Sequence, residues 1–375
     1  MVKQERLIGE FMELVRVDSE TGHEAEMSRV LKTKFAELGL SLEEDDAAAK
    51  TGHGANNLFA TLPATEGVQA PVIFFTSHMD TVTPGKGIQP RLDEDGYIRS
   101  DGTTILGSDD KAGLTAMLEA IRVLKEQEIP HGTVQFVITV GEESGLVGAR
   151  ALDADKLQAA YGYALDSNGK VGDIAVAAPS QAKITMHIYG RSAHAGVNPE
   201  DGISAIQVAS KAIARMPLGR IDKETTANIG RFEGGGATNI VCDYVLLTAE
   251  ARSISASKLE KQIEAMRQAL ESAAEENGAR AELKSSLVYP AYTHGESDPV
   301  VEVAKTAIAA VGLTPRTFHS GGGSDANIFN GLGVPTVNLA VGYEHIHTTK
   351  EQIKADDLAK TAELVVQIIR QTAAE

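Results

Sequence analysis

Three apolar segments of the sequence, residues 72–76, 134–140 and 161–165, end in side chains that can bind a metal ion or move a proton. These side chains are His78 with Asp80, Glu142 with Glu143, and Asp166. A helical pattern over residues 112–126 separates the first two segments, which predicts a βαβ unit. Because the carboxyl ends of parallel strands meet at one edge of a sheet, we expect these side chains to lie close together.

Two further residues complete a set of ligands for two metal ions. They are Asp109 in GSDDKAG and His347 in HIHTTKE. A catalytic zinc ion takes three protein ligands and leaves a position for water. With Asp109 as a bridge, one ion takes His78 and Asp166, and the other takes Glu143 and His347. Three carboxylates and a bridging hydroxide then balance two dications. We therefore expect two zinc ions, with cobalt or manganese as substitutes.

Asp80 and Glu142 are left over from this ligand set, and each has a natural task. His78 and Asp80 point to the same side of an extended chain, so Asp80 is suited to accept the second ring N–H of His78. Glu142 stands beside a ligand and is suited to take a proton from the attacking water and pass it to a leaving amine. A single acidic pair is usually a solvated turn, but the joint placement of these groups favours a hydrolytic site.

Five strings of the sequence resemble the dinuclear zinc exopeptidases and deacylases, which include peptidase T, carboxypeptidase G and aminoacylase. The strings are HMDTV, GSDDKAG, GEESG, ALDS and the spacing from His347 to Glu351. The resemblance covers almost the whole chain, and GSDDKAG and HIHTTKE are most similar to the peptidase T branch. It implies that His78, Asp109, Glu143, Asp166 and His347 bind the metals, and that Asp80 and Glu142 are catalytic.

The same resemblance decides three choices that the residues alone leave open. It favours Asp109 over Asp110 as the bridge, with a cis peptide after it. It makes the first residue of the pair Glu142–Glu143 the base. It favours His347 over His345, because only His347 has the downstream glutamate at the family spacing.

The pattern changes near residue 180, where QAKITMHIYG alternates apolar and polar residues like an antiparallel strand with one solvent face. Further helices and strands are expected at 202–215, 226–232, 244–252, 256–275 and 281–288. After Pro290 the first pattern resumes, with a helix at 299–310, a strand in TVNLAV and a terminal helix at 355–372. We expect an α/β catalytic domain with a mixed, largely parallel sheet flanked by helices (1–179 and 293–375). An inserted α+β sandwich (180–292) would serve as a lid and dimerisation domain.

Two residues of the expected insertion are candidates for substrate contact. His194, in GRSAHAG, could be an ordinary solvent-facing turn histidine. The resemblance instead implies that it reaches the scissile carbonyl from a neighbouring subunit and stabilises the oxyanion. Asn239, in GGGATNIV, is a second candidate, although the glycines before it could form no more than a flexible turn.

Arg252 and the glycine-rich loop HSGGGSDAN are candidates for binding the rest of the substrate. A strand-end arginine usually faces water, but its planar fork suits a terminal carboxylate, and the resemblance supports that use. In the loop, Gly322 and Ser324 would let the backbone approach a ligand. The loop could equally be a helix start, with Ser324 or Asp325 as the N-cap.

The composition excludes several classes of partner. The 375 residues include 52 acidic and 35 basic side chains, for a net charge of −17, which disfavours nucleic acid and anionic membranes. No segment approaches the roughly 20 apolar residues of a membrane span, and the N-terminus lacks a signal-peptide core, so we expect a cytoplasmic protein. The single cysteine, Cys242, excludes an internal disulfide and is expected in the core.

The sequence therefore predicts a homodimeric metallopeptidase that hydrolyses short peptides, in the manner of an aminotripeptidase. The first alternative is an N-acyl-amino-acid deacylase or a carboxypeptidase with the same metal site. Arg252 suits a substrate carboxylate, but no acid is an evident partner for a substrate amine. A remote alternative is a non-catalytic metal-binding dimeric scaffold, whose mark would be a missing ligand or base, and neither is missing here.

Overall fold

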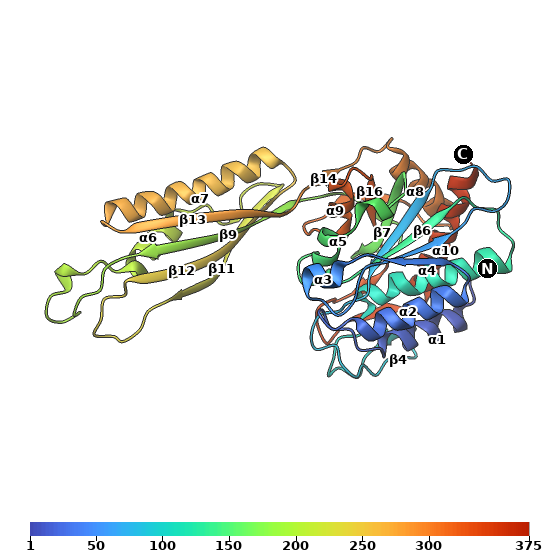
Figure 1. Cartoon of the computed structure of the whole chain (residues 1–375), viewed down its shortest axis with the longest axis horizontal. Helices are drawn as coiled ribbons and strands as arrows, with labels where there is room; N and C mark the ends of the chain where they lie inside the picture. Colours follow the sequence, from blue (N-terminus) through green and yellow to red (C-terminus); the bar gives the residue numbers. More distant parts are fainter. Residues whose placement is uncertain (375) are drawn as a thin grey trace. The chain divides into compact units, whose positions relative to one another are not determined.

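The computed structural model describes residues 1–374, which form two compact units (Figure 1). The first unit comprises Met1–Ala177, His294–Ser320 and the chain from Ser324 onward. The inserted unit comprises Ala178–Thr293 together with Gly321–Gly323. The sequence placed the insertion at 180–292 and did not assign the glycine loop to it.

The first unit is built on a mixed sheet with the strand order β1-β2-β6-β3-β7-β16-β8, and β15 also pairs with β8. These strands are β1 (Ser41–Glu44), β2 (Leu58–Leu62), β3 (Ile73–His78), β6 (Val134–Thr139), β7 (Tyr161–Ser167), β8 (Asp173–Ala178), β15 (Arg316–His319) and β16 (Thr336–Ala340). The central neighbours β6, β3, β7 and β16 are parallel, whereas β1–β2, β2–β6 and β16–β8 are antiparallel. The predicted mixed, largely parallel sheet is confirmed.

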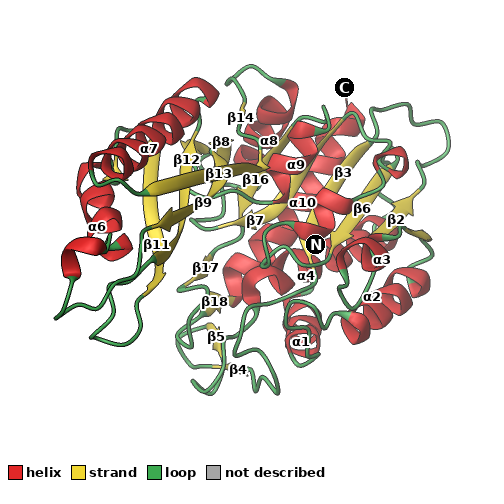
Figure 2. Ribbon diagram, turned by 60° about the vertical axis from the view of Figure 1, so that its left-hand side comes forward, coloured by secondary structure: helices red, strands yellow, loops and turns green. Residues whose placement is uncertain are grey.

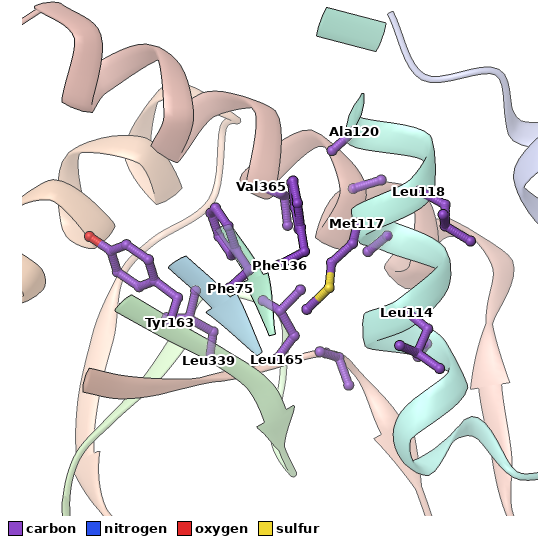
Figure 3. Packing of buried hydrophobic residues seen from close by; sticks show 14 of the residues in the cluster. Phe75, Leu114, Met117, Leu118, Ala120, Phe136, Tyr163, Leu165, Leu339 and Val365 are labelled. Carbon is purple, nitrogen blue, oxygen red and sulfur yellow. The ribbon is translucent and has the colours of Figure 1, made fainter. Parts of the chain in front are cut away.

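Helices cover both faces of this sheet. The main core packs against α1 (Gln4–Val15), α2 (Ala25–Glu37), α4 (Ser108–Glu126), α8 (Pro299–Ala310) and α10 (Ala355–Ala374). Figure 3 shows Phe75, Phe136 and Tyr163 of the sheet beside Met117 of α4 and Val365 of α10. On the opposite face, Phe329 of α9 (Asp325–Gly331) packs on Phe74, with ring centroids 4.7 Å apart. Burial on both faces explains why the central strands read as continuous apolar runs.

Strands β1, β2, β8 and β15 of the large sheet were not predicted. Several shorter elements of the first unit were also not predicted, namely α3 (Ala47–Thr51), α5 (Val147–Ala151), the 3-10 turn η1 (Ala154–Lys156), and a small sheet ordered β17-β18-β5-β4, whose strands are β4 (Arg91–Leu92), β5 (Tyr97–Arg99), β17 (Tyr343–Glu344) and β18 (Gln352–Lys354). The small sheet joins two distant segments of sequence and flanks the loop that carries His347. Strands of two to four residues are too short to show a period of two, so the sequence pattern gave no signal for them.

The inserted unit is a five-stranded antiparallel sheet with the order β10-β11-β12-β9-β13. Its elements are β9 (Ser180–Tyr189), η2 (Pro199–Asp201), α6 (Ala205–Arg215), β10 (Gly219–Arg220), β11 (Thr225–Gly234), β12 (Tyr244–Ser253), α7 (Ala256–Glu276), β13 (Arg280–Tyr289) and β14 (Tyr292–Thr293). Figure 2 shows α6 and α7 beside the strands of this sheet. Residues along β12 alternate between buried and accessible, which confirms the predicted sheet with one covered face and one open face.

Two smaller expectations concern the surface and the cysteine. Among residues 1–374, no helix is long and apolar enough to cross a membrane. Cys242 is half-buried and packs at the margin of the inserted unit's core, with its Sγ 3.1 Å from the Tyr244 carbonyl oxygen. The prediction of a core cysteine is therefore only partly met.

Candidate metal centre

The carboxyl ends of the parallel strands hold three overlapping groups of potential metal ligands. The groups are His78 with Asp109 and Asp166, His78 with Glu142 and Glu143, and Asp109 with Glu143 and His347. Within each group, one donor atom of each residue lies within 4.8 Å of the others. The structure thus brings all five predicted ligands and the predicted base together in the first unit.

His78, the last residue of β3, is buried at the centre of this cluster. Its Nε2 lies 3.1 Å from Asp109 Oδ1 and 3.8 Å from Asp166 Oδ1. Its Nδ1 lies 2.9 Å from the carbonyl oxygen of Asp80 and 3.4 Å from the Asp80 carboxylate. The nearest acceptor for the second ring N–H is therefore the backbone of Asp80 rather than the predicted carboxylate. In either case, Nε2 is left to face the acids.

The buried carboxylate of Asp80 instead holds the turn that carries Glu142 and Glu143. It accepts the backbone N–H of Glu142 at 3.0 Å and that of Glu143 at 3.2 Å. Burial alone would raise the pKa of Asp80, but its contacts with His78 and with the Glu142 N–H lower the pKa below its usual value. Asp80 is thus an ionised anchor for both the histidine and the glutamate turn.

Asp109 is positioned by Glu351, to which sequence reasoning gave no role of its own. The Glu351 carboxylate is buried and accepts hydrogen bonds from four donors: the backbone N–H groups of Leu106, Gly107 and Asp109, and the Ser108 hydroxyl, at 2.6–3.0 Å. The Asp109–Asp110 peptide bond is cis, as the resemblance implied. Burial opposes ionisation of Asp109, but hydrogen bonds from His347 and His78 lower its pKa.

Asp166 lies near the end of β7 and is fixed by two neighbours. The Tyr343 hydroxyl donates to Asp166 Oδ1 at 3.1 Å. The Asn338 side chain bonds both to the N–H and to the carbonyl oxygen of Asp166, at 3.0 Å and 2.8 Å. Burial, followed by the charges of Asp109 and Glu142, raises the pKa of Asp166 well above its usual value.

His347 lies in the loop between β17 and β18, with a φ of 62°, an unfavourable region for a residue with a side chain. Its Nε2 lies 2.9 Å from Glu143 Oε1 and 3.2 Å from Asp109 Oδ2. These two hydrogen bonds, that to Asp109 first, raise the pKa of His347 to about 10. In the metal-free chain, the imidazolium therefore stands between the two carboxylates.

The electrostatics of the cluster fit a pair of divalent cations. Burial, with the charges of neighbouring acids, also raises the pKa of Glu142 well above its usual value. Several carboxyl groups are thus crowded where only protons or cations can relieve their repulsion. Imidazole nitrogen and carboxylate oxygen are the donors that zinc takes, and Asp109 faces a histidine on each side. The residues present therefore match the two ligand groups expected from the sequence.

Comparison with known proteins gives a consistent assignment. Residues 74–371 match the model of peptidase family M20/M25/M40. The chain belongs to this family. A relative from Bacillus subtilis (strain 168), named "Uncharacterized protein YqjE", is 60% identical over 100% of both chains.

Two solved structures are also similar over nearly the full length. A structure described as aminopeptidase PepT from Bacillus cereus ATCC 10987 is 62% identical, with a TM-score of 0.94 and 99% coverage of each chain. A structure described as a tripeptidase from Staphylococcus aureus subsp. aureus Mu50 is 49% identical, with a TM-score of 0.97 and 100% coverage of each chain. The predicted resemblance is confirmed, and the chain is a metallopeptidase of the M20 type rather than a scaffold.

Three buried groups of this M20 peptidase were not predicted from the sequence to take part in the site. The first is Glu351, described above. The second is Lys111, whose Nζ donates to Ser19 Oγ at 2.8 Å; burial lowers its pKa to about 8 against the opposing charges of Asp80 and Glu351. The third is Asp325, whose pKa is raised by burial to about 6 and whose Oδ2 accepts from Thr139 Oγ1 at 2.5 Å. The sequence did hold a signal for the role of Lys111, because this charged residue stands in the motif GSDDKAG directly before an apolar helical stretch.

In the inserted unit of the peptidase, His194 and Asn239 are brought together by backbone pairing. His194 pairs with Ile240, and the Ala195 N–H donates to the Asn239 carbonyl oxygen at 2.9 Å. The His194 side chain is exposed, and its Nδ1 accepts the backbone N–H of Gly196 at 3.1 Å. A neutral ring must then carry its proton on Nε2, so the outer nitrogen is a donor.

Arg252 and Gly322 are also neighbours in the inserted unit. A Cβ added at Gly322 would lie 3.9 Å from Arg252 Nη1, so the glycine backbone borders the guanidinium. Ser324 belongs to the first unit and is the N-cap of α9, where its hydroxyl accepts the Ala326 N–H at 3.3 Å. The helix-start interpretation of the loop therefore describes Ser324, whose side chain is buried.

Proposed function

We propose that this M20 peptidase is a zinc-dependent aminotripeptidase that releases the N-terminal residue of short peptides. The single observation that carries the proposal is the convergence of a complete ligand set with Glu142 at one sheet edge. The descriptions of the two similar structures, an aminopeptidase and a tripeptidase, support the choice of substrate. The homodimer and the cytoplasmic location expected from the sequence remain predictions.

In this proposal, His78 and Asp166 would hold one zinc ion, Glu143 and His347 would hold the other, and Asp109 would be a ligand of both. When bound, such a pair supplies Lewis-acid polarisation of the scissile carbonyl and a water that ionises near neutral pH. The protein contributes by holding the ligand side chains in fixed positions. Asp80 and Glu351 fix the backbone on either side of the cluster, so that little reorganisation is needed on binding.

Glu142 is the proposed proton carrier. Its backbone is held by Asp80, while among residues 1–374 no protein group donates a hydrogen bond to its carboxylate, which leaves its oxygens for water or substrate. The raised pKa of Glu142 is suited to a group that must accept a proton from water and later release it to the leaving amine. The bond between the carbonyl carbon and the amide nitrogen breaks as the nitrogen receives that proton.

The inserted unit supplies the proposed contacts to the substrate. His194 presents an Nε2–H donor, which suits a developing oxyanion. In the expected homodimer, His194 of one protomer serves the site of its partner. Asn239 and Arg252 complete the proposed substrate contacts, Arg252 by binding the terminal carboxylate through its guanidinium.

An assay of amine release tests the substrate choice. The protein is stripped of metal, supplied with zinc, cobalt or manganese, and offered tripeptides, dipeptides and N-acyl amino acids. Metal-dependent cleavage of tripeptides with a free N-terminus, but not of their N-acetyl forms, is the expected result. Turnover of the acylated compounds alone would favour the deacylase, since Arg252 suits the carboxylate of either substrate class.

A further inference from the structure

The guanidinium of Arg252 is held on one edge by a second charged residue of the same strand. Its Nε donates to Glu250 Oε1 at 2.9 Å and its Nη2 to Glu250 Oε2 at 3.3 Å. Glu250 and Arg252 are two residues apart on β12, so both point to the face of the sheet that α6 and α7 leave open. The pair is a two-point contact rather than a single ion pair in solvent.

Gln181 braces Glu250 from the neighbouring strand. Gln181 lies directly opposite Arg252 in the register of β9 and β12. Its Nε2 donates to Glu250 Oε2 at 2.5 Å. Glu250 therefore receives donors from two strands, and its rotamer is set before any ligand arrives. Burial alone would raise the pKa of Glu250, but the contacts with Arg252 and Gln181 lower it, so the carboxylate stays charged.

The opposite edge of the guanidinium is left for a ligand. Among residues 1–374, Nη1 of Arg252 donates no hydrogen bond to the protein. The neighbour on that side is the backbone at Gly322, where even an added Cβ would stay 3.9 Å away. Gly323 cannot carry a side chain in this arrangement, because its Cβ would lie 2.3 Å from the Tyr289 ring. The loop thus lies close to the arginine without covering its terminal edge.

We infer that Glu250 is a positioning residue that holds Arg252 by its Nε edge and presents the Nη edge to the C-terminal carboxylate of the substrate. This inference rests on the proposed role of Arg252 and extends it. A free arginine side chain has several rotatable bonds, and ordering it on binding weakens affinity. The braced pair removes that penalty from the binding step. It also offers the substrate a fixed fork, which only a planar carboxylate can meet at two points.

The test compares Glu250→Gln with the wild-type holoenzyme on one tripeptide and on its C-terminal amide. Glutamine keeps one acceptor oxygen but loses the charge and the two-point contact. We expect KM for the free acid to rise about threefold to tenfold with kcat unchanged, while KM for the amide stays constant. A matched control is Glu282→Gln, since Glu282 pairs with Arg280 two residues away on the exposed strand β13. Glu282→Gln should leave both constants unchanged.

Three results would overturn the inference. One is an unchanged ratio of the two KM values in Glu250→Gln. Another is a lower KM for the free acid, which would mean that Glu250 competes with the substrate for Arg252. A third is an equal effect of Glu282→Gln. If the protein proves to be a deacylase, an N-acyl amino acid and its amide replace the tripeptides, so failure of the aminotripeptidase proposal remains distinguishable. Arg252→Ala, which should abolish the preference for the free acid, tests the underlying role separately.

Discussion

The metal centre of the first unit and the substrate residues of the inserted unit are built in opposite ways. His78, Asp80 and Glu351 are almost inaccessible, and each makes hydrogen bonds to neighbours distant in sequence. The His194 side chain is exposed on a loop and, within residues 1–374, makes one hydrogen bond, to the Gly196 N–H. The buried centre is positioned by many hydrogen bonds at once, whereas the exposed His194 side chain depends on a single one. The chemistry should therefore fail abruptly when altered, and recognition should weaken by degrees.

The largest effect is expected in the buried region, from Glu142→Ala. Removing the proton carrier should lower kcat by about 10²–10⁴-fold, because general acid–base catalysis typically contributes that much. The bound metal should stay at the wild-type stoichiometry, since none of the five ligands is touched. Steady-state kinetics with metal analysis by atomic emission checks both points. Unchanged turnover would sink the assignment of Glu142.

The next effect tests whether the hydrogen bonds of Glu351 around Asp109 are needed for metal affinity. Glu351→Ala leaves four donors without their acceptor and frees the backbone on either side of Ser108. We expect metal affinity to fall about 10-fold to 100-fold, as is usual when partners of ligands are lost. Competition with a chelator measures this. The exposed Glu344→Ala is the control, and equal losses in both variants would contradict the role given to Glu351.

A smaller effect is expected from the inserted unit, where one hydrogen bond sets the tautomer of His194. Gly196→Pro removes the N–H that Nδ1 accepts, whereas Gly196→Ala keeps it and adds a Cβ only 3.8 Å from the ring, an ordinary contact. We expect Gly196→Pro to lower kcat about tenfold, less than the 10²–10³-fold for loss of a whole oxyanion donor. Gly196→Ala should behave like the wild type. Equal activity of both variants would show that the tautomer does not matter.

The smallest effect concerns the pH dependence of stability, which should differ between the metal-free protein and the protein with bound metal. The folded pKa of His347 is raised from 6.5 to about 10, so its contribution to metal-free stability is complete below pH 6.5 and is lost as pH rises toward 10. The raised pKa values of Asp166 and Glu142 act in the same direction, because these acids bind more protons when folded. Bound metal replaces those protons. The gain in Tm on adding zinc should therefore grow by a few degrees between pH 6.5 and 9.

If the gain in Tm on adding zinc became smaller as the pH rises from 6.5 to 9, the proposed replacement of protons by metal would be contradicted. Thermal unfolding followed by circular dichroism, with and without a chelator, provides the measurement. His347→Gln serves as the control, since it removes the titrating ring, and its metal-free Tm should vary less with pH.

The sequence was sufficient to predict the parallel strands at the centre of the first unit's sheet and the gathering of the candidate ligands at one edge of that sheet, because both depend on local signals. Apolar runs with β-branched residues marked the strands, and His78, Glu142 and Asp166 follow those runs in the chain. The family resemblance, now confirmed by the match over residues 74–371, chose between neighbouring acids. Alternation along QAKITMHIYG likewise marked β9 and the open face of the inserted sheet.

The contacts that position the ligands could not be read from the chain. The Glu351 carboxylate accepts a hydrogen bond from the Ser108 hydroxyl across more than two hundred residues of sequence, and no local pattern predicts such a pair. Helix α4 begins at Ser108, four residues before the predicted start at 112, and is interrupted at Asp109 and Asp110, which depart from helical backbone angles. The apolar pattern gave no signal for this first turn because its residues are polar. The ring Nδ1 of His78 lies 2.9 Å from the Asp80 carbonyl oxygen and 3.4 Å from the Asp80 carboxylate; spacing in the sequence predicts the partner residue, and only the fold shows which of its atoms is nearer.

The inserted unit leaves and rejoins the first unit through segments that are hydrogen-bonded to each other, with the His294 N–H donating to the Val176 carbonyl oxygen at 2.8 Å. In evolutionary terms, such a unit can be exchanged as a module. An insertion whose two ends are already adjacent can lengthen, shrink or be exchanged without separating the strands that carry the ligands. Evolution can therefore change the substrate specificity through the inserted unit while the buried metal centre stays the same.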